Sequence, residues 1–162
     1  MPLNIYPYDR TLVYDYAKTW SFSRNPNYYD FSTLGGDCTN FCSQCIFAGA
    51  PVMNYTKTLG WYFLSLNNRA PSWTGVEQLY NFLVSNKESG PFAVPCELTE
   101  VKVGDVVQLG NFNGDFYHSP IVTAVIDNNV YVGAHSNDAF NRNLLTYNAQ
   151  VIRCAHILGF RK

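Results

Sequence analysis

The stretch that decides the fold reads GGDCTNFCSQC and runs from Gly35 to Cys45. Its two glycines permit an adaptable turn, and the aspartate that follows them is a good helix N-cap. An apolar-rich run over Phe41–Ala48 ends at Gly49, so the pattern predicts a helix. Cys38 then lies in the first turn, where unpaired backbone N–H groups and the helix dipole favour a thiolate over a thiol. Cys38 is therefore a candidate nucleophile if a histidine lies near it.

The composition indicates one globular domain spanning residues 1–162. Hydrophobic residues make up 47% and aromatic residues 16% of the chain, enough for a substantial core. The net charge is −1 and only 14% of the residues are charged, so we expect no nucleic-acid partner and no membrane anchor. The first six residues lack the features of a signal peptide. The sequence leaves two locations open: the cytoplasm, or the extracellular space and cell wall if the chain is a fragment of a secreted protein.

Helical patterns come first in the chain and strand patterns second. Apolar residues at helical spacing predict helices over Arg10–Ser21, Cys38–Ala48 and Gly75–Ser85. Runs rich in β-branched and aromatic residues predict strands over Val101–Leu109, Phe116–Ile126, Val130–Ala134, Leu144–Tyr147 and Val151–Leu158. The expected fold class is α+β, with N-terminal helices packed on a C-terminal antiparallel sheet.

Two of the three histidines lie on the predicted hairpin that turns at residues 127–129. A nucleophilic cysteine needs a base that takes its proton, and the base needs an acceptor that fixes its tautomer. His118 lies in the first strand, and His135 and Asn137 lie at the end of the second. With a two- or four-residue loop, these three residues share one face of the hairpin. A three-residue loop or a bulge reverses the parity and brings Asp138 to that face.

Four motifs resemble the bacterial "Putative amidase domain" family. They are GGDCTNFCSQ at Gly35, SW at Ser72, GDVV at Gly104 and HSPIVT at His118, and the resemblance extends from about Tyr8 to His135. That family is a relative of the CHAP and NlpC-type cysteine peptidases of the papain-like superfamily. The cysteine motif and the histidine motif, in that order, are quite specific together.

The resemblance implies a papain-like fold and hydrolysis of amide bonds, typically in bacterial cell-wall peptidoglycan. It makes Cys38 the nucleophile and His118 the base, with His135 the first choice and Asn137 the second for the residue that orients the base. The backbone N–H of Cys38 would help to hold the oxyanion. The implied reaction passes through a thioester and needs no metal and no organic cofactor. We expect a monomer whose partner is a peptide or amide substrate, including peptidoglycan.

Other functions fit parts of the sequence. The same scaffold could bind wall peptide or glycan without cleaving it. The spacing of Cys38, Cys42 and Cys45 matches three cluster ligands of radical enzymes that cleave S-adenosylmethionine, but here it lies on an apolar helix of a short chain. We therefore expect Cys42 and Cys45 to pack in the core. No repeated Cys-x-x-Cys pair and no His-x-x-x-His motif supports a closed zinc site.

Overall fold

The structure is a computed structural model that describes all 162 residues. It contains the helices α1 (Arg10–Trp20), α2 (Cys38–Gly49), α3 (Pro71–Thr74) and α4 (Val76–Ser85), and the 3₁₀ turns η1 (Leu98–Glu100) and η2 (Leu144–Tyr147). The strands are β1 (Ile5–Tyr6), β2 (Phe63–Ser65), β3 (Asn68–Arg69), β4 (Gly90–Cys96), β5 (Val106–Gly110), β6 (Phe116–His118), β7 (Ile121–Ile126), β8 (Asn129–Ala134), β9 (Ala139–Asn143) and β10 (Val151–Arg161).

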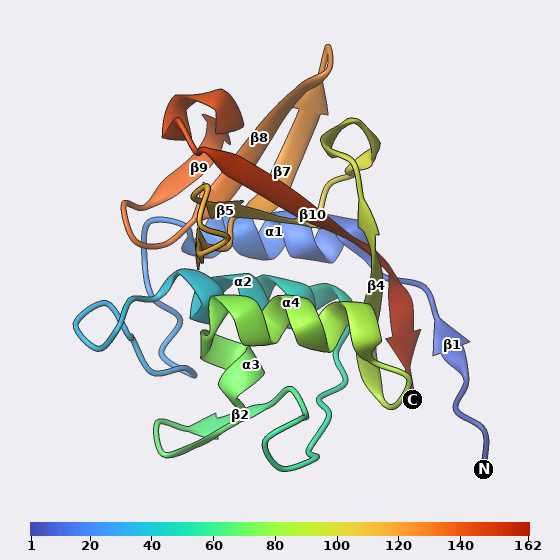
Figure 1. Cartoon of the computed structure of the whole chain (residues 1–162). Helices are drawn as coiled ribbons and strands as arrows, with labels where there is room; N and C mark the ends of the chain where they lie inside the picture. Colours follow the sequence, from blue (N-terminus) through green and yellow to red (C-terminus); the bar gives the residue numbers. More distant parts are fainter.

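One curled antiparallel sheet holds eight of the ten strands. Its order is β1-β10-β5-β7-β8-β9, with β4 added beside β10 and β6 beside β5. Strands β2 and β3 form a separate ribbon. Figure 1 shows the helices on one side of the sheet, with α1 next to the strands and α2 and α4 beyond it. The protein therefore combines a helical layer with an antiparallel sheet, as the sequence predicts.

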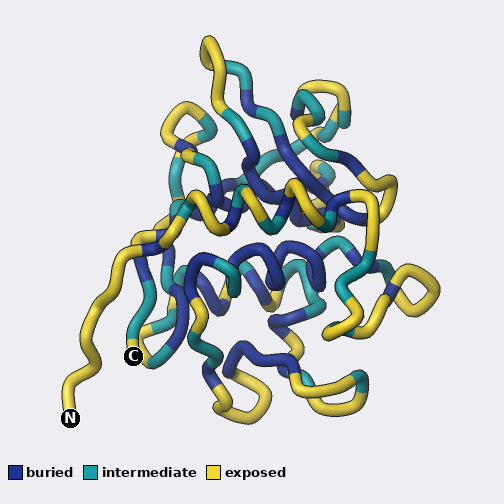
Figure 2. The backbone as a smooth tube through the Cα atoms, turned by 180° about the vertical axis from the view of Figure 1, so that it is seen from behind, coloured by how far each residue is buried: buried dark blue, intermediate teal, exposed yellow.

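Apolar residues fill both faces of the sheet. The larger cluster has 20 buried residues, including Trp61 and Trp73, and packs the helices against the sheet. The smaller cluster has 8 buried residues, including Leu144 of η2. Val106 belongs to the first cluster and Val107 to the second, because successive side chains of a strand point to opposite faces. Figure 2 shows that the backbone of α2 is buried along most of its length.

Several elements differ from the sequence-based prediction. The segment Leu144–Tyr147 is a 3₁₀ turn rather than a strand, since the Asn143 side chain accepts a hydrogen bond from the Leu145 N–H and starts a turn. The predicted strand Phe116–Ile126 is divided into β6 and β7. Strands β4 and β9, the short strands β1, β2 and β3 and the short helix α3 were not predicted. The two prolines of β4 hide the strand pattern in the sequence. They are tolerated because β4 pairs only with β10.

None of the helices is long and apolar enough to cross a lipid bilayer.

Candidate active site

The site is built on the first turn of α2. Gly35 and Gly36 have φ values of 85° and 100°, which confirms the tight turn before the helix. Cys38 is the first helical residue and is half-buried. Its sulfur has one polar contact, with Thr39 Oγ1 at 3.7 Å. The backbone N–H groups of residues 38–40 donate to no acceptor in the protein, so they can receive an oxyanion.

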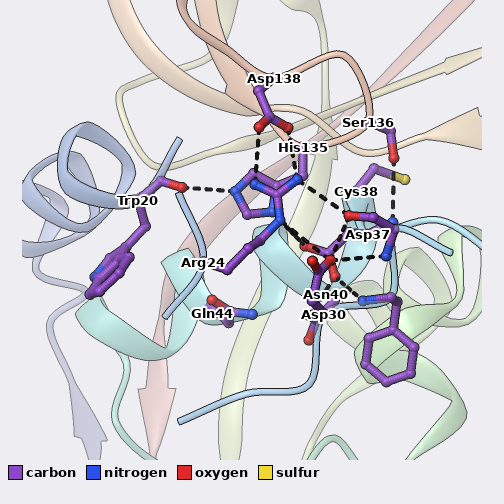
Figure 3. Close-up of polar contacts among 12 residues, drawn as sticks. Trp20, Arg24, Asp30, Asp37, Cys38, Asn40, Gln44, His135, Ser136 and Asp138 are labelled. Carbon is purple, nitrogen blue, oxygen red and sulfur yellow. Dashed lines mark hydrogen bonds and ion pairs between the residues drawn. The ribbon is translucent and has the colours of Figure 1, made fainter. Parts of the chain in front are cut away.

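Asp37 occupies the N-cap position, but its side chain does not cap the helix. The carboxylate is buried, with 1% of the residue exposed. Its Oδ1 accepts hydrogen bonds of 2.8 Å from the Phe31 N–H and from Asn40 Nδ2. Its Oδ2 faces His135 Nδ1, and the guanidinium of Arg24 lies 3.8 Å away. The aspartate therefore ties the start of α2 to the preceding loop and to the end of β8 (Figure 3).

His135 has both ring nitrogens occupied. Nε2 lies 2.8 Å from the backbone oxygen of Trp20, and a carbonyl oxygen can only accept, so Nε2 carries a proton. Nδ1 contacts Asp37, and the ring stacks on Phe41 with centroids 3.9 Å apart. Figure 3 shows the sulfur of Cys38 pointing away from this ring. The structure therefore does not place His135 where it can orient another histidine.

His118 ends β6 and is 7% exposed. Neither of its ring nitrogens has a hydrogen-bond partner in the protein, and its ring packs on that of Tyr147 with centroids 5.6 Å apart. Burial, and then the positive charge of Arg142, lower the pKa of His118 from 6.5 to about 4. His118 is consequently a neutral imidazole at physiological pH, with a nitrogen free to accept a proton.

A hydrogen bond joins the neighbours of Cys38 and His118. Thr39 Oγ1 donates to Ser119 Oγ at 3.2 Å, across 80 residues of sequence. Ser119 Oγ also accepts from Gln108 Nε2 at 3.0 Å. This contact fastens the end of β6 to the first turn of α2. No hydrogen bond connects Cys38 Sγ with His118 itself, as is common in active sites without substrate.

The hairpin of β7 and β8 differs from the predicted one. Its turn has two residues, Asp127 and Asn128, and its register shifts between Val122 and Ala124. The predicted strand Phe116–Ile126 divides into β6 and β7, and His118 pairs with Leu109 of β5. The prediction that His118 lies on the same hairpin as His135 is therefore wrong.

The segment after β8 does not supply an orienting residue for His118. Asp138 binds Arg24 instead, with carboxylate-to-guanidinium distances of 3.0 and 3.1 Å. Asn137 is exposed and makes no hydrogen bond with its side chain. His118 thus lacks a hydrogen-bonded partner of the kind that the sequence predicts, and its ring is held by packing on Tyr147.

The remaining cysteines differ from Cys38 in their surroundings. Cys42 and Cys45 are fully buried in the larger core cluster, which confirms the sequence-based prediction. Burial raises the pKa of the Cys96 thiol to about 11 and that of Cys154 to about 12. No group of three or more His, Cys, Asp and Glu side chains lies close enough together to hold a metal ion.

Comparison with known proteins identifies the family. Residues 7–157 match the family described as "Putative amidase domain". The chain belongs to this amidase family. A relative, the "Uncharacterized protein YhbB" of Bacillus subtilis (strain 168), is 35% identical over 123 residues, which are 74% of this chain and 38% of the relative. No solved structure gives a significant match. Membership supports amide hydrolysis as the general chemistry of this domain.

Two residues near His118 escaped the sequence reasoning. Tyr147 lies in a segment predicted as a strand, and Arg142 lies on β9, which was not predicted. The ring of Tyr147 packs on that of His118, and the guanidinium of Arg142 lies over the ring of Tyr147. No short motif in the sequence marks either residue. A lone arginine among polar residues carries no signal of its position.

Proposed function

We propose that this domain is a cysteine amidohydrolase of papain-like fold that cleaves peptide amide bonds through a thioester. The observation that supports this most is the Thr39–Ser119 hydrogen bond, which fastens the helix start bearing Cys38 to the strand end bearing the unpaired, neutral His118. A thiol at a helix N-terminus beside a neutral imidazole is a recurrent arrangement for nucleophilic attack on acyl groups.

The steps follow from the properties of these residues. His118 takes the thiol proton of Cys38, and the sulfur attacks the amide carbon. The oxyanion is held by the free N–H groups of the first turn of α2. His118 then gives its proton to the leaving amine, and the C–N bond breaks to leave a thioester. Water attacks the thioester as His118 removes its proton, which releases a carboxylic acid and restores the thiol.

The pKa of His118 sets the protonation state at the start. Because its pKa is about 4, the imidazole is ready to accept a proton at any pH above that value. Peptides of the bacterial cell wall are the substrate class that the family resemblance favours, and intracellular peptide amides are the second. In the papain-like interpretation, relatives in the CHAP and NlpC families share this arrangement of a cysteine on a helix and a histidine on a strand.

The test is hydrolysis of purified muropeptides and of peptidyl aminomethylcoumarins by wild type and variants. Cys38→Ala and His118→Gln should each lose nearly all product formation, while folding stays intact by circular dichroism. Cys96→Ala is the matched control, because it removes a partly exposed thiol outside the site and should leave the rate unchanged. Mass spectrometry of the quenched wild type should find the acyl group on Cys38.

Two results would contradict the proposal. Product formation that survives Cys38→Ala excludes the thiol as nucleophile. Saturable binding of muropeptides by both wild type and Cys38→Ala, with no product from either, indicates a binding module on the same scaffold.

A further inference from the structure

Arg142 holds an uncompensated positive charge beside His118. Its guanidinium lies 3.7 Å over the centre of the Tyr147 ring, and the other contacts of that ring include the imidazole of His118. Nε donates to Thr146 Oγ1 at 2.8 Å and Nη2 to the Thr146 carbonyl at 3.1 Å. The guanidinium is therefore fixed by η2, while Nη1 has no partner in the protein.

The partners of Arg142 are all neutral, which sets it apart from most arginines of this fold. Arg24 lies within 4 Å of three carboxylates, Arg10 binds Asp105, and Arg153 binds Glu77. Arg142 has no acidic side chain within 4 Å. A half-exposed guanidinium without a carboxylate offers its planar donor groups to an anion from solution.

Two other arginines, Arg69 and Arg161, also lack a carboxylate partner. Arg69 stacks on Phe31 and Arg161 stacks on Phe92, and neither shares an aromatic contact with His118. Arg142 is thus the arginine whose charge bears on the catalytic base. Next to it, the hydroxyl oxygen of Tyr147 is buried and has no hydrogen-bond partner.

This charge opposes the proposed reaction in the free protein. His118 must become positive when it takes the thiol proton, and the guanidinium of Arg142 disfavours a second cation nearby. Arg142 is the one charged side chain that lowers the pKa of His118. A negative group of the substrate that binds Arg142 would cancel its charge. Protonation of His118 would then be less unfavourable when the thiol proton is transferred.

We propose that Arg142 and Tyr147 form a subsite for a carboxylate of the substrate, so that the domain prefers amides that carry a carboxylate near the cleaved bond. This inference rests on the proposed function for its catalytic part, but the binding of a carboxylate to Arg142 does not depend on catalysis. The carboxylate can be that of an acidic side chain or of a peptide C-terminus, since both present the same two oxygens to the guanidinium.

The first experiment tests binding without turnover. Glutarate is titrated into Cys38→Ala protein at pH 7, where both of its carboxyl groups are ionised, and the ring resonances of His118 are followed by NMR. Saturating glutarate should shift these resonances, because a carboxylate on Arg142 cancels the charge next to the imidazole. The shift should vanish in Cys38→Ala/Arg142→Gln and persist in Cys38→Ala/Arg161→Gln, which removes a similarly stacked arginine elsewhere.

The second experiment tests specificity with paired substrates. Peptide amides that differ only by Glu against Gln beside the cleaved bond, or by a free against an amidated C-terminus, separate the two sources of carboxylate. Wild type should favour one acidic substrate about tenfold in kcat/KM, which corresponds to about 1.4 kcal/mol. Arg142→Gln should lower this ratio to near one, Arg142→Lys should retain part of it, and Arg161→Gln should leave it unchanged.

The outcomes separate this inference from the proposed function. If glutarate shifts His118 through Arg142 and no amide is cleaved, the subsite stands and the hydrolase proposal fails. If amides are cleaved by Cys38 with equal rates for acidic and neutral pairs, the subsite is refuted. Glutarate that leaves His118 unchanged, or that acts equally on the Arg142→Gln protein, also overturns it.

Discussion

Replacing His135 by phenylalanine should strongly destabilise the protein. The new ring can still stack on Phe41, but the Asp37 carboxylate then loses its contact with Nδ1 and the Trp20 carbonyl loses its donor. Both members of the pair are 1% exposed, and Arg24 at 3.8 Å is too distant to replace the imidazole. Leaving the buried carboxylate without its partner costs about 3–5 kcal/mol, a large part of the stability of a typical domain.

Replacing Asp37 by asparagine should cost less. The amide oxygen can still accept from the Phe31 N–H, and a neutral His135 that keeps its proton on Nε2 can accept from the new amide nitrogen. The loss is then the difference between a charge-assisted and a neutral hydrogen bond, about 1–2 kcal/mol. The double variant leaves no buried charge unpaired, so it should be more stable than the sum of the two single losses predicts.

Urea unfolding at pH 7, followed by the fluorescence of the buried Trp61 and Trp73, measures these differences. Asp30→Asn is the matched control, because Asp30 pairs with Arg24 at the surface and its loss should cost under about 1 kcal/mol. The reasoning is refuted if His135→Phe costs no more than Asp30→Asn, or if the losses at positions 37 and 135 simply add.

Three further predictions concern other parts of the fold. The stability of wild type relative to His118→Gln should fall between about pH 6.5 and pH 4, because the folded protein keeps this histidine neutral while the unfolded chain protonates it. The loss, on the order of 3 kcal/mol, is measured by urea unfolding at several pH values, and a pH-independent difference would contradict the burial of the imidazole. Iodoacetamide at pH 7.5 should alkylate Cys38 before Cys96 and Cys154, whose pKa values are raised, as peptide mapping by mass spectrometry would show; equal rates at all three would contradict this order. Gly49→Ala should cost about 1–3 kcal/mol in urea unfolding, since its methyl group would lie 2.5 Å from a Val13 methyl, and an unchanged midpoint would show that α1 yields easily.

Several local elements of this fold can be predicted from the sequence. Helix α2 begins at Cys38 as predicted, because the Gly-Gly turn and the N-cap position are decided by neighbouring residues. The burial of Cys42 and Cys45 follows from helical spacing alone. The order of helices before strands likewise fixes the general architecture, because each type of element must bury its apolar face against another.

The details of the site depend on contacts that no local pattern encodes. His135 contacts Asp37, which lies 98 residues earlier in the chain, and the sequence around His118 does not show that its strand ends before Ile121. Whether Asp138 meets His118 or Arg24 is decided by where the loop after α1 passes, about 114 residues earlier in the chain. Sequence reasoning therefore names candidate residue types but cannot assign them to one another.

The first turn of α2, which carries Cys38, is held in place by residues that are synthesised much later. The contacts that fix this turn come from Ser119, His135 and Ser136, which follow Asp37 or Thr39 by 80 to 99 residues. A ribosome therefore completes helix α2 long before it makes the strands that hold its first turn in place. Until then His118 and the contacts that order the first turn of α2 are absent. Under the proposed mechanism, the cysteine of the growing chain therefore has no base and becomes reactive only after the late strands have folded.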